Sequence, residues 1–230
     1  MIFVNMKIPA FIIILTLLAF PYISGQSSSN SSEGETDFNV DLDFYSLYIW
    51  RGSKIGQGPH FQAEMEFTAG GLAIGVWGTV DLNGYSEADP YLTYTFPSGL
   101  SFGIIDYYYP GLPLRDVSRE TGSHAFEISC NYSNGGLSIS TNYILNEAGG
   151  AGSEGKDLYF EAGYSFNRLS IFAGAGNGWH TSDGRFNICN LGLQTEKIIE
   201  ITEKFSLPVS GRVIYNPDSD HLYLVVGISF

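Results

Sequence analysis

Acidic residues recur at every second position in three segments of the chain, a spacing that places side chains on the same face of a strand. The pairs are Asp41 with Asp43, Glu64 with Glu66, and Glu87 with Asp89. Neighbouring carboxyl groups attract cations if they face an open space, and form a packing network if arginines pair with them. The elements that position these residues therefore decide their chemistry.

Nucleophilic and metal-binding residues are sparse by comparison. The histidines are His60, His124, His180 and His221, with Ser123 beside one and Ser182 near another. Neither serine lies in a G-x-S-x-G motif, and adjacent strand residues point to opposite faces, so Ser123 and His124 should not meet. Cys130 and Cys189 are far apart and lack the spacing of metal ligands. We expect no enzymatic activity, no cofactor and no metal site.

Composition limits both the partners and the size of the fold. The formal net charge of −13 would repel phosphates, so we expect no nucleic-acid partner. The 230 residues, which include 28 Gly, 15 Tyr and 16 Phe, are enough for one large all-β domain.

The N-terminal segment has the features of a secretory signal. Lys7 precedes the apolar run IPAFIIILTLLAF, and small residues follow at Ser24 and Gly25. We expect residues 1–25 to be a cleaved signal peptide and residues 26–37, which are Ser-rich, to be a disordered lead-in. An uncleaved anchor helix is the alternative, but the run is short for a membrane span and contains Pro9.

The rest of the chain, 38–230, repeats one short turn motif between alternating segments. An aromatic residue, a tight Gly-containing turn and an alternating apolar segment recur in FTAGGLAIG, FPSGLSFG and YSNGGLSIS. Extending this alternation predicts about twelve strands. They lie near 38–51, 60–69, 72–82, 88–96, 100–109, 123–133, 137–145, 157–166, 168–177, 186–196, 204–215 and 221–230.

The connections between these strands alternate between short and long. AGG, PSG, NGG and the pair Asn167–Arg168 are short, whereas GSKIGQGP, NGYSE, GLPLRDVSRETG, NEAGGAGSEGK and GWHTSDGR are longer. Only KIIEITEK breaks the rule. The pattern predicts a transmembrane antiparallel up-and-down β-barrel with short periplasmic turns and longer external loops, as in the outer membrane of a Gram-negative bacterium.

Aromatic residues support the membrane barrel over the alternative of a soluble barrel or sandwich. One group falls near the short-turn ends, namely Phe67, Phe96, Tyr132, Tyr164, Phe166 and Phe230, and another near the outer ends, namely Tyr48, Trp50 and Tyr215. Two such girdles around an apolar band are typical of lipid interfaces. The alternating last strand ending in Phe230 also resembles the terminal signal that the barrel-insertion machinery reads in outer-membrane proteins.

Several motifs together resemble a known family. FYSLYIWRG, GPHFQAEMEF, GVWGT, YSEADPYLTY and DYYYPG are similar to segments of the TorF-like or Gcw-type outer-membrane porins, over nearly the whole mature chain. The most specific part is the motif Trp50–Arg51–Gly52, and Leu47 departs from the usual polar residue. The resemblance implies a porin-like barrel and does not decide a solute.

If the apolar faces contact lipid, the opposite faces line the lumen. The predicted lumen-lining and selectivity residues are Asp41, Asp43, Arg51, Glu64, Glu66, Asp81, Glu87, Asp89, Glu127, Glu161 and Arg212. Their excess of acids predicts a channel for passive, cation-preferring passage of small solutes. Two alternatives stay open, a non-conducting structural or surface-binding barrel and an outer-membrane lipid hydrolase.

Overall fold

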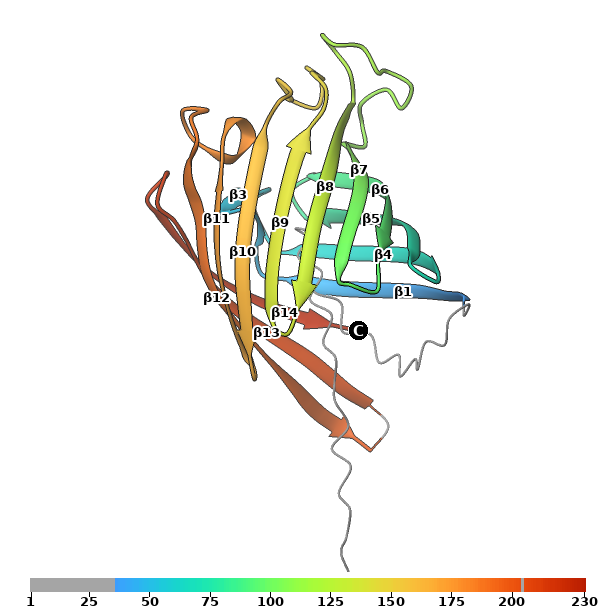
Figure 1. Cartoon of the computed structure of the whole chain (residues 1–230), viewed down its shortest axis with the longest axis vertical. Helices are drawn as coiled ribbons and strands as arrows, with labels where there is room; N and C mark the ends of the chain where they lie inside the picture. The colour runs from blue at the N-terminus through green and yellow to red at the C-terminus, as the bar shows by residue number, and fades with distance from the viewer. Residues whose placement is uncertain (1–35, 204) are drawn as a thin grey trace, which may run out of the picture.

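The computed structural model describes residues 36–203 and 205–230, and this part of the chain forms a closed antiparallel barrel of twelve strands (Figure 1). The expected signal peptide and residues 26–35 of the expected lead-in lie outside the described residues, whereas Thr36 and Asp37 of that lead-in belong to the first strand. The barrel strands are β1 (Thr36–Tyr45), β4 (His60–Ala69), β5 (Leu72–Asp81), β6 (Ser86–Thr95), β7 (Leu100–Tyr108), β8 (His124–Asn134), β9 (Leu137–Ile144), β10 (Leu158–Phe166), β11 (Leu169–Gly176), β12 (Asn187–Thr202), β13 (Phe205–Asn216) and β14 (His221–Ser229). Each strand pairs with its neighbours in sequence order, and β14 closes the barrel on β1. The predicted fold class is confirmed.

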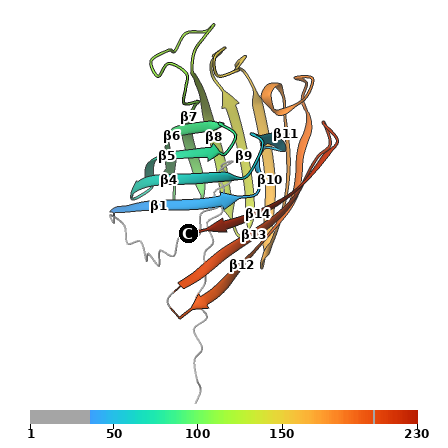
Figure 2. The ribbon, with the colours of Figure 1, turned by 180° about the vertical axis from the view of Figure 1, so that it is seen from behind.

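The alternation of short and long connections is also present. Turns of a few residues join β4 to β5, β6 to β7, β8 to β9 and β10 to β11 at one end of the barrel, while the longest connections, 46–59, 109–123, 145–157 and 177–186, lie at the other (Figures 1 and 2). The turn glycines Gly70, Gly99 and Gly135 have positive φ, which explains why glycine recurs at these corners.

Two predicted boundaries are wrong. The first strand ends at Tyr45 instead of residue 51, and the chain then forms a separate two-stranded hairpin of β2 (Tyr48–Trp50) and β3 (Ser53–Ile55). KIIEITEK is not a long connection, because β12 continues through most of it to Thr202. The consecutive apolar residues Ile198 and Ile199 interrupt the alternation, yet they pair with Pro208 and Leu207 of β13 and extend that hairpin.

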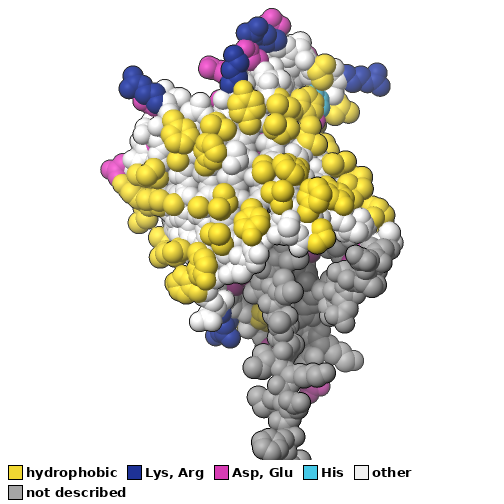
Figure 3. All heavy atoms as spheres, viewed as in Figure 1, with side chains coloured by type: hydrophobic (Ala, Val, Ile, Leu, Met, Phe, Trp, Pro, Cys, Tyr) yellow, Lys and Arg dark blue, Asp and Glu magenta, His cyan; other side chains and the backbone are white. Residues whose placement is uncertain are grey.

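Exposed and enclosed side chains alternate along the barrel strands. On β5, Ile74, Val76 and Val80 are exposed, whereas Trp77 and Thr79 between them are buried. Figure 3 shows hydrophobic side chains over the barrel wall and most of the visible Lys and Arg side chains near the long loops. Within the described residues no helix is long and apolar enough to span a membrane.

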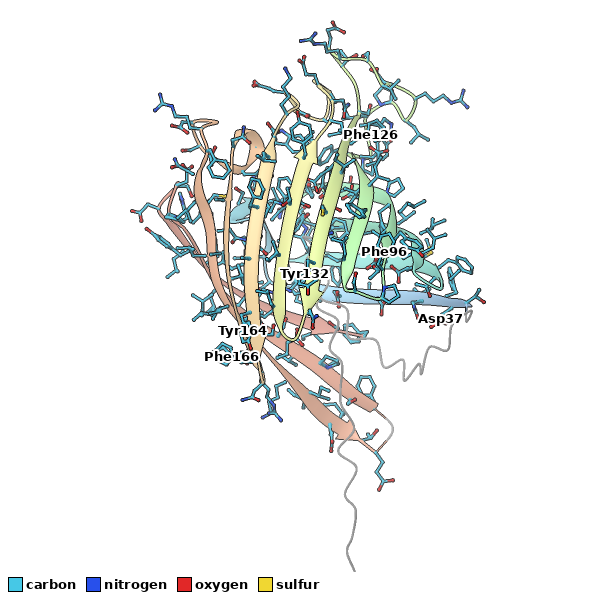
Figure 4. The ribbon with its side chains drawn as sticks, viewed as in Figure 1. Asp37, Phe96, Phe126, Tyr132, Tyr164 and Phe166 are labelled. Carbon is cyan, nitrogen blue, oxygen red and sulfur yellow. The ribbon has the colours of Figure 1, made fainter. Side chains whose placement is uncertain are left out.

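The aromatic residues form one of the two expected girdles. Phe96, Tyr132, Tyr164 and Phe166 lie near the ends of strands that carry short turns, and Phe126 lies toward the opposite end (Figure 4). The assignment of Tyr48 and Trp50 to an outer girdle is wrong, since both are buried in the hairpin. Tyr215 is exposed, together with Phe160 and Phe186, which pack against each other between β10 and the start of β12.

Arginine placed at different depths along the strands tests whether the outer face of the barrel contacts lipid. Val76 lies mid-strand opposite Met65 and Pro90, and Ile139 lies opposite Tyr132 near the short turns. In a membrane, Val76→Arg should lower the free energy of unfolding by about 2–4 kcal/mol, and Ile139→Arg by about 0–1 kcal/mol. Urea unfolding in lipid vesicles, with Val76→Leu as the control, measures both. A cost near zero at Val76 would contradict a lipid-facing wall, and equal costs at the two positions would contradict the depth assigned to Ile139.

Candidate functional site

The candidate site is the space that the barrel encloses. Apart from Arg51, every predicted lumen residue lies on a barrel strand at an inward-facing position of the alternating pattern. Arg51 instead lies at the tip of the β2–β3 hairpin, which occupies the first long connection. Apart from Asp43 and Arg212, these residues fall into three groups with different surroundings.

The first group is an acidic patch on β1 and β4. Asp41 is directly opposite Glu64 in the strand register, and Asn39 is opposite Glu66. The Tyr91 hydroxyl contacts the carboxyl groups of both Glu64 and Glu66, the latter at 2.8 Å. In the described part of the chain no Lys or Arg forms an ion pair with these acids. The patch therefore brings several carboxyl groups together on the inward face of β1 and β4.

The second group consists of acids that are held by local hydrogen bonds. Glu87 and Asp89 are buried beside an aromatic cluster, where the Tyr85 hydroxyl donates to Glu87 at 2.8 Å and the Tyr108 backbone N–H to Asp89 at 3.2 Å. Asp81 accepts backbone N–H groups of Gln57, Asn83 and Tyr85 at 2.8–3.0 Å, and Glu161 accepts the Asn190 amide at 2.7 Å. These contacts fit structural roles better than a path for ions.

The third group joins the hairpin to the opposite wall. The Arg51 guanidinium donates to both carboxylate oxygens of Glu127 on β8, at 2.6 and 2.8 Å, and both side chains are almost fully buried. The Tyr107 hydroxyl donates to the same carboxylate at 3.1 Å. The guanidinium also lies 4.6 Å from the centre of the Tyr159 ring on β10. A bidentate pair in this setting fixes the position of the hairpin tip.

The tip meets two further strands on that wall. The Asn216 amide of β13 donates to the Gly52 carbonyl at 3.0 Å, and a Cβ at Gly52 would lie 1.9 Å from the Cys189 carbonyl oxygen of β12. The hairpin leaves the wall between β1 and β4, whereas β8 and β10 lie on the far side of the strand order. It therefore crosses the lumen.

The residues of the turn explain why the sequence pattern does not reveal the β2–β3 hairpin. Arg51 has φ of 50° and Gly52 has φ of 86°, so both central residues of the tight turn are left-handed. Asn-Gly or Asp-Gly is the usual signal for such a turn, and Arg-Gly is not. The sequence feature that indicates a turn here is the run of glycines in GSKIGQGP, which follows the aromatic residues Tyr48 and Trp50.

His124 and its neighbour Ser123 have separate hydrogen-bond partners. The His124 ring nitrogens lie 2.7 Å from an Asp106 oxygen and 2.8 Å from the Leu114 carbonyl oxygen, while the Ser123 hydroxyl donates to the Pro113 carbonyl at 2.8 Å. Burial and the nearby Arg51 guanidinium hold the pKa of His180 well below its usual value. Among the described residues there is no group of three or more side chains that could ligate a metal ion.

Comparisons with known proteins give limited information. No protein-family model and no curated protein matches the chain. A mutant of the Rh. blastica porin is similar in structure, with 13% sequence identity and a TM-score of 0.39. The match covers 74% of this chain and 55% of that one, so this chain spans about half the length of the porin it matches. A likeness this weak carries no argument about function.

Proposed function

We propose that the chain forms an outer-membrane channel for passive passage of small solutes, with a preference for cations. The supporting observation is a closed barrel that is apolar outside and has an acidic patch without ion-pair partners inside. The resemblance of the WRG motif and its flanking segments to TorF-like or Gcw-type porins agrees with this proposal. A cleaved signal peptide, periplasmic short turns and insertion through Phe230 belong to the same proposal.

The charge balance inside the barrel supports the cation preference. Arg51 is neutralised by Glu127. Arg212 is then the main inward cation, against four inward acids, namely Asp41, Asp43, Glu64 and Glu66. Fixed charges act strongly on an ion in a narrow lumen because little water screens them.

The hairpin sets the size of the path. A twelve-strand barrel lies between small barrels that side chains fill and large ones with a wide aqueous channel. With residues 46–59 across the lumen, we expect a low conductance. The same hairpin is the observation that favours the competing function, a non-conducting surface or structural barrel.

Removing charge from the acidic patch tests the selectivity. The double variant Glu64→Gln and Glu66→Gln keeps side-chain size and hydrogen bonding, so under a salt gradient its reversal potential should move toward zero. The matched control is Glu120→Gln with Glu154→Gln, which removes two exposed loop charges and should leave the potential unchanged. If the patch variant behaves like the control, these carboxylates do not select ions.

A further inference from the structure

A cavity lies between the hairpin and the barrel wall, next to the acidic patch on β1 and β4. It is a small recess that opens to the solvent, and the 280 Å³ or so of empty space in and in front of it includes that open solvent. Leu47 and Ile49 line it from the hairpin, and Ile214 and Val225 line it from β13 and β14. These four side chains give the cavity an aliphatic wall.

Arg212 brings a cation to this cavity and makes no close ion pair there. Its guanidinium lies 5.1 Å from the centre of the Tyr45 ring, and its buried Nε has no hydrogen-bond partner. Among the described residues, it forms no ion pair or hydrogen bond with a carboxylate. A buried N–H without an acceptor is costly, and the planar donors of a guanidinium fit a carboxylate.

Two acceptors nearby also lack donors. Gln62 lines the cavity, is 3% exposed, and has no hydrogen bond to its buried Oε1. Asp43 lies directly opposite Gln62 in the register and is also 3% exposed. Ser229 lies beside its carboxyl group, and its Oδ1 has no hydrogen-bond partner. An ammonium group has donors for both of these oxygens.

We infer that this cavity binds a small zwitterion with a short aliphatic body, such as an aliphatic α-amino acid. The carboxylate would pair with Arg212, the ammonium with Asp43 and Gln62, and the aliphatic part with the four apolar side chains. A simple anion fits less well, because Asp43, Glu161 and Glu196 all act electrostatically with Arg212. A simple amine would leave the guanidinium without an acceptor. The inference rests on the proposed channel, since the solute reaches the cavity through the lumen.

Three probes that share one aliphatic body separate these possibilities. They are leucine, 4-methylpentanoate, which lacks the amine, and 3-methylbutylamine, which lacks the carboxylate. Calorimetric titration of the refolded full chain in detergent should show binding of leucine, with each truncated probe weaker by about tenfold or more. Equal binding of 4-methylpentanoate and leucine, equal binding of the amine, or no leucine binding would each overturn the inference.

Variants locate the site. Arg212→Met should abolish leucine binding, and Arg212→Lys, which keeps the charge and loses the planar fork, should weaken it about tenfold. Ser101→Ala, at an inward position of β7, is the control and should bind as the wild type does. Wild-type affinity in a folded Arg212→Lys variant would overturn the site. Calorimetry in detergent does not depend on conductance in a bilayer. If the protein binds leucine but conducts no ions, the proposed channel is wrong and the binding site is not.

Discussion

Replacing Gly52 with alanine should raise the single-channel conductance. The new Cβ would lie 1.9 Å from the Cys189 carbonyl oxygen, and this backbone atom on β12 cannot rotate away as a flexible side chain could. The hairpin tip would then move away from β12 and lose the hydrogen bond that the Asn216 amide donates to the Gly52 carbonyl. Since the tip carries Arg51, the whole crossing of the lumen should loosen and widen the path.

Gly84→Ala is the matched control for this change. Gly84 also has a positive φ, 98°, but no heavy atom lies within 4 Å of the position that a Cβ would take there. Both variants should bear the backbone cost of a left-handed alanine, about 1–2 kcal/mol. Only Gly52→Ala should conduct more in planar bilayers. The same conductance in both variants would show that the hairpin does not obstruct the path.

Arg51→Ala should give the largest loss of stability. It leaves Glu127, whose side chain is 2% exposed, as a buried charge without its partner. Removing one member of a buried pair costs about 3–5 kcal/mol, whereas replacing both by apolar residues is often close to neutral. Urea unfolding should therefore show a large loss for Arg51→Ala and a much smaller one for Arg51→Met with Glu127→Leu. If the double variant loses as much as the single one, the buried charge is not the cause.

The barrel could be predicted because its signals are local. Alternation in segments such as Leu72–Asp81 and Gly turns at Gly70, Gly99 and Gly135 each report one strand or one corner. The acidic patch followed for the same reason, because Asp41 and Glu64 have fixed places in their own strands. Their pairing across β1 and β4 needed only the correct register.

The hairpin could not be predicted because its position depends on distant contacts. Arg51 and Glu127 are 76 residues apart, and Gly52 and Asn216 are 164 apart. The alternation of Tyr48 and Trp50 reads as a continuation of the first strand, and only packing against other strands reveals that they leave the wall. The end of β12 was missed because Ile198 and Ile199 break the alternation that cross-strand pairing restores.

The most direct measurement compares the conductance of the intact chain with that of a chain lacking the hairpin. Tyr45 and His60 are directly paired, so a short Gly-Ser linker can replace residues 47–58 and keep the pairing of β1 with β4. In planar bilayers the intact protein should show small, steady, cation-preferring currents, and the shortened protein should show larger ones. Silence from both refolded proteins, or equal currents, would contradict a channel narrowed by this hairpin.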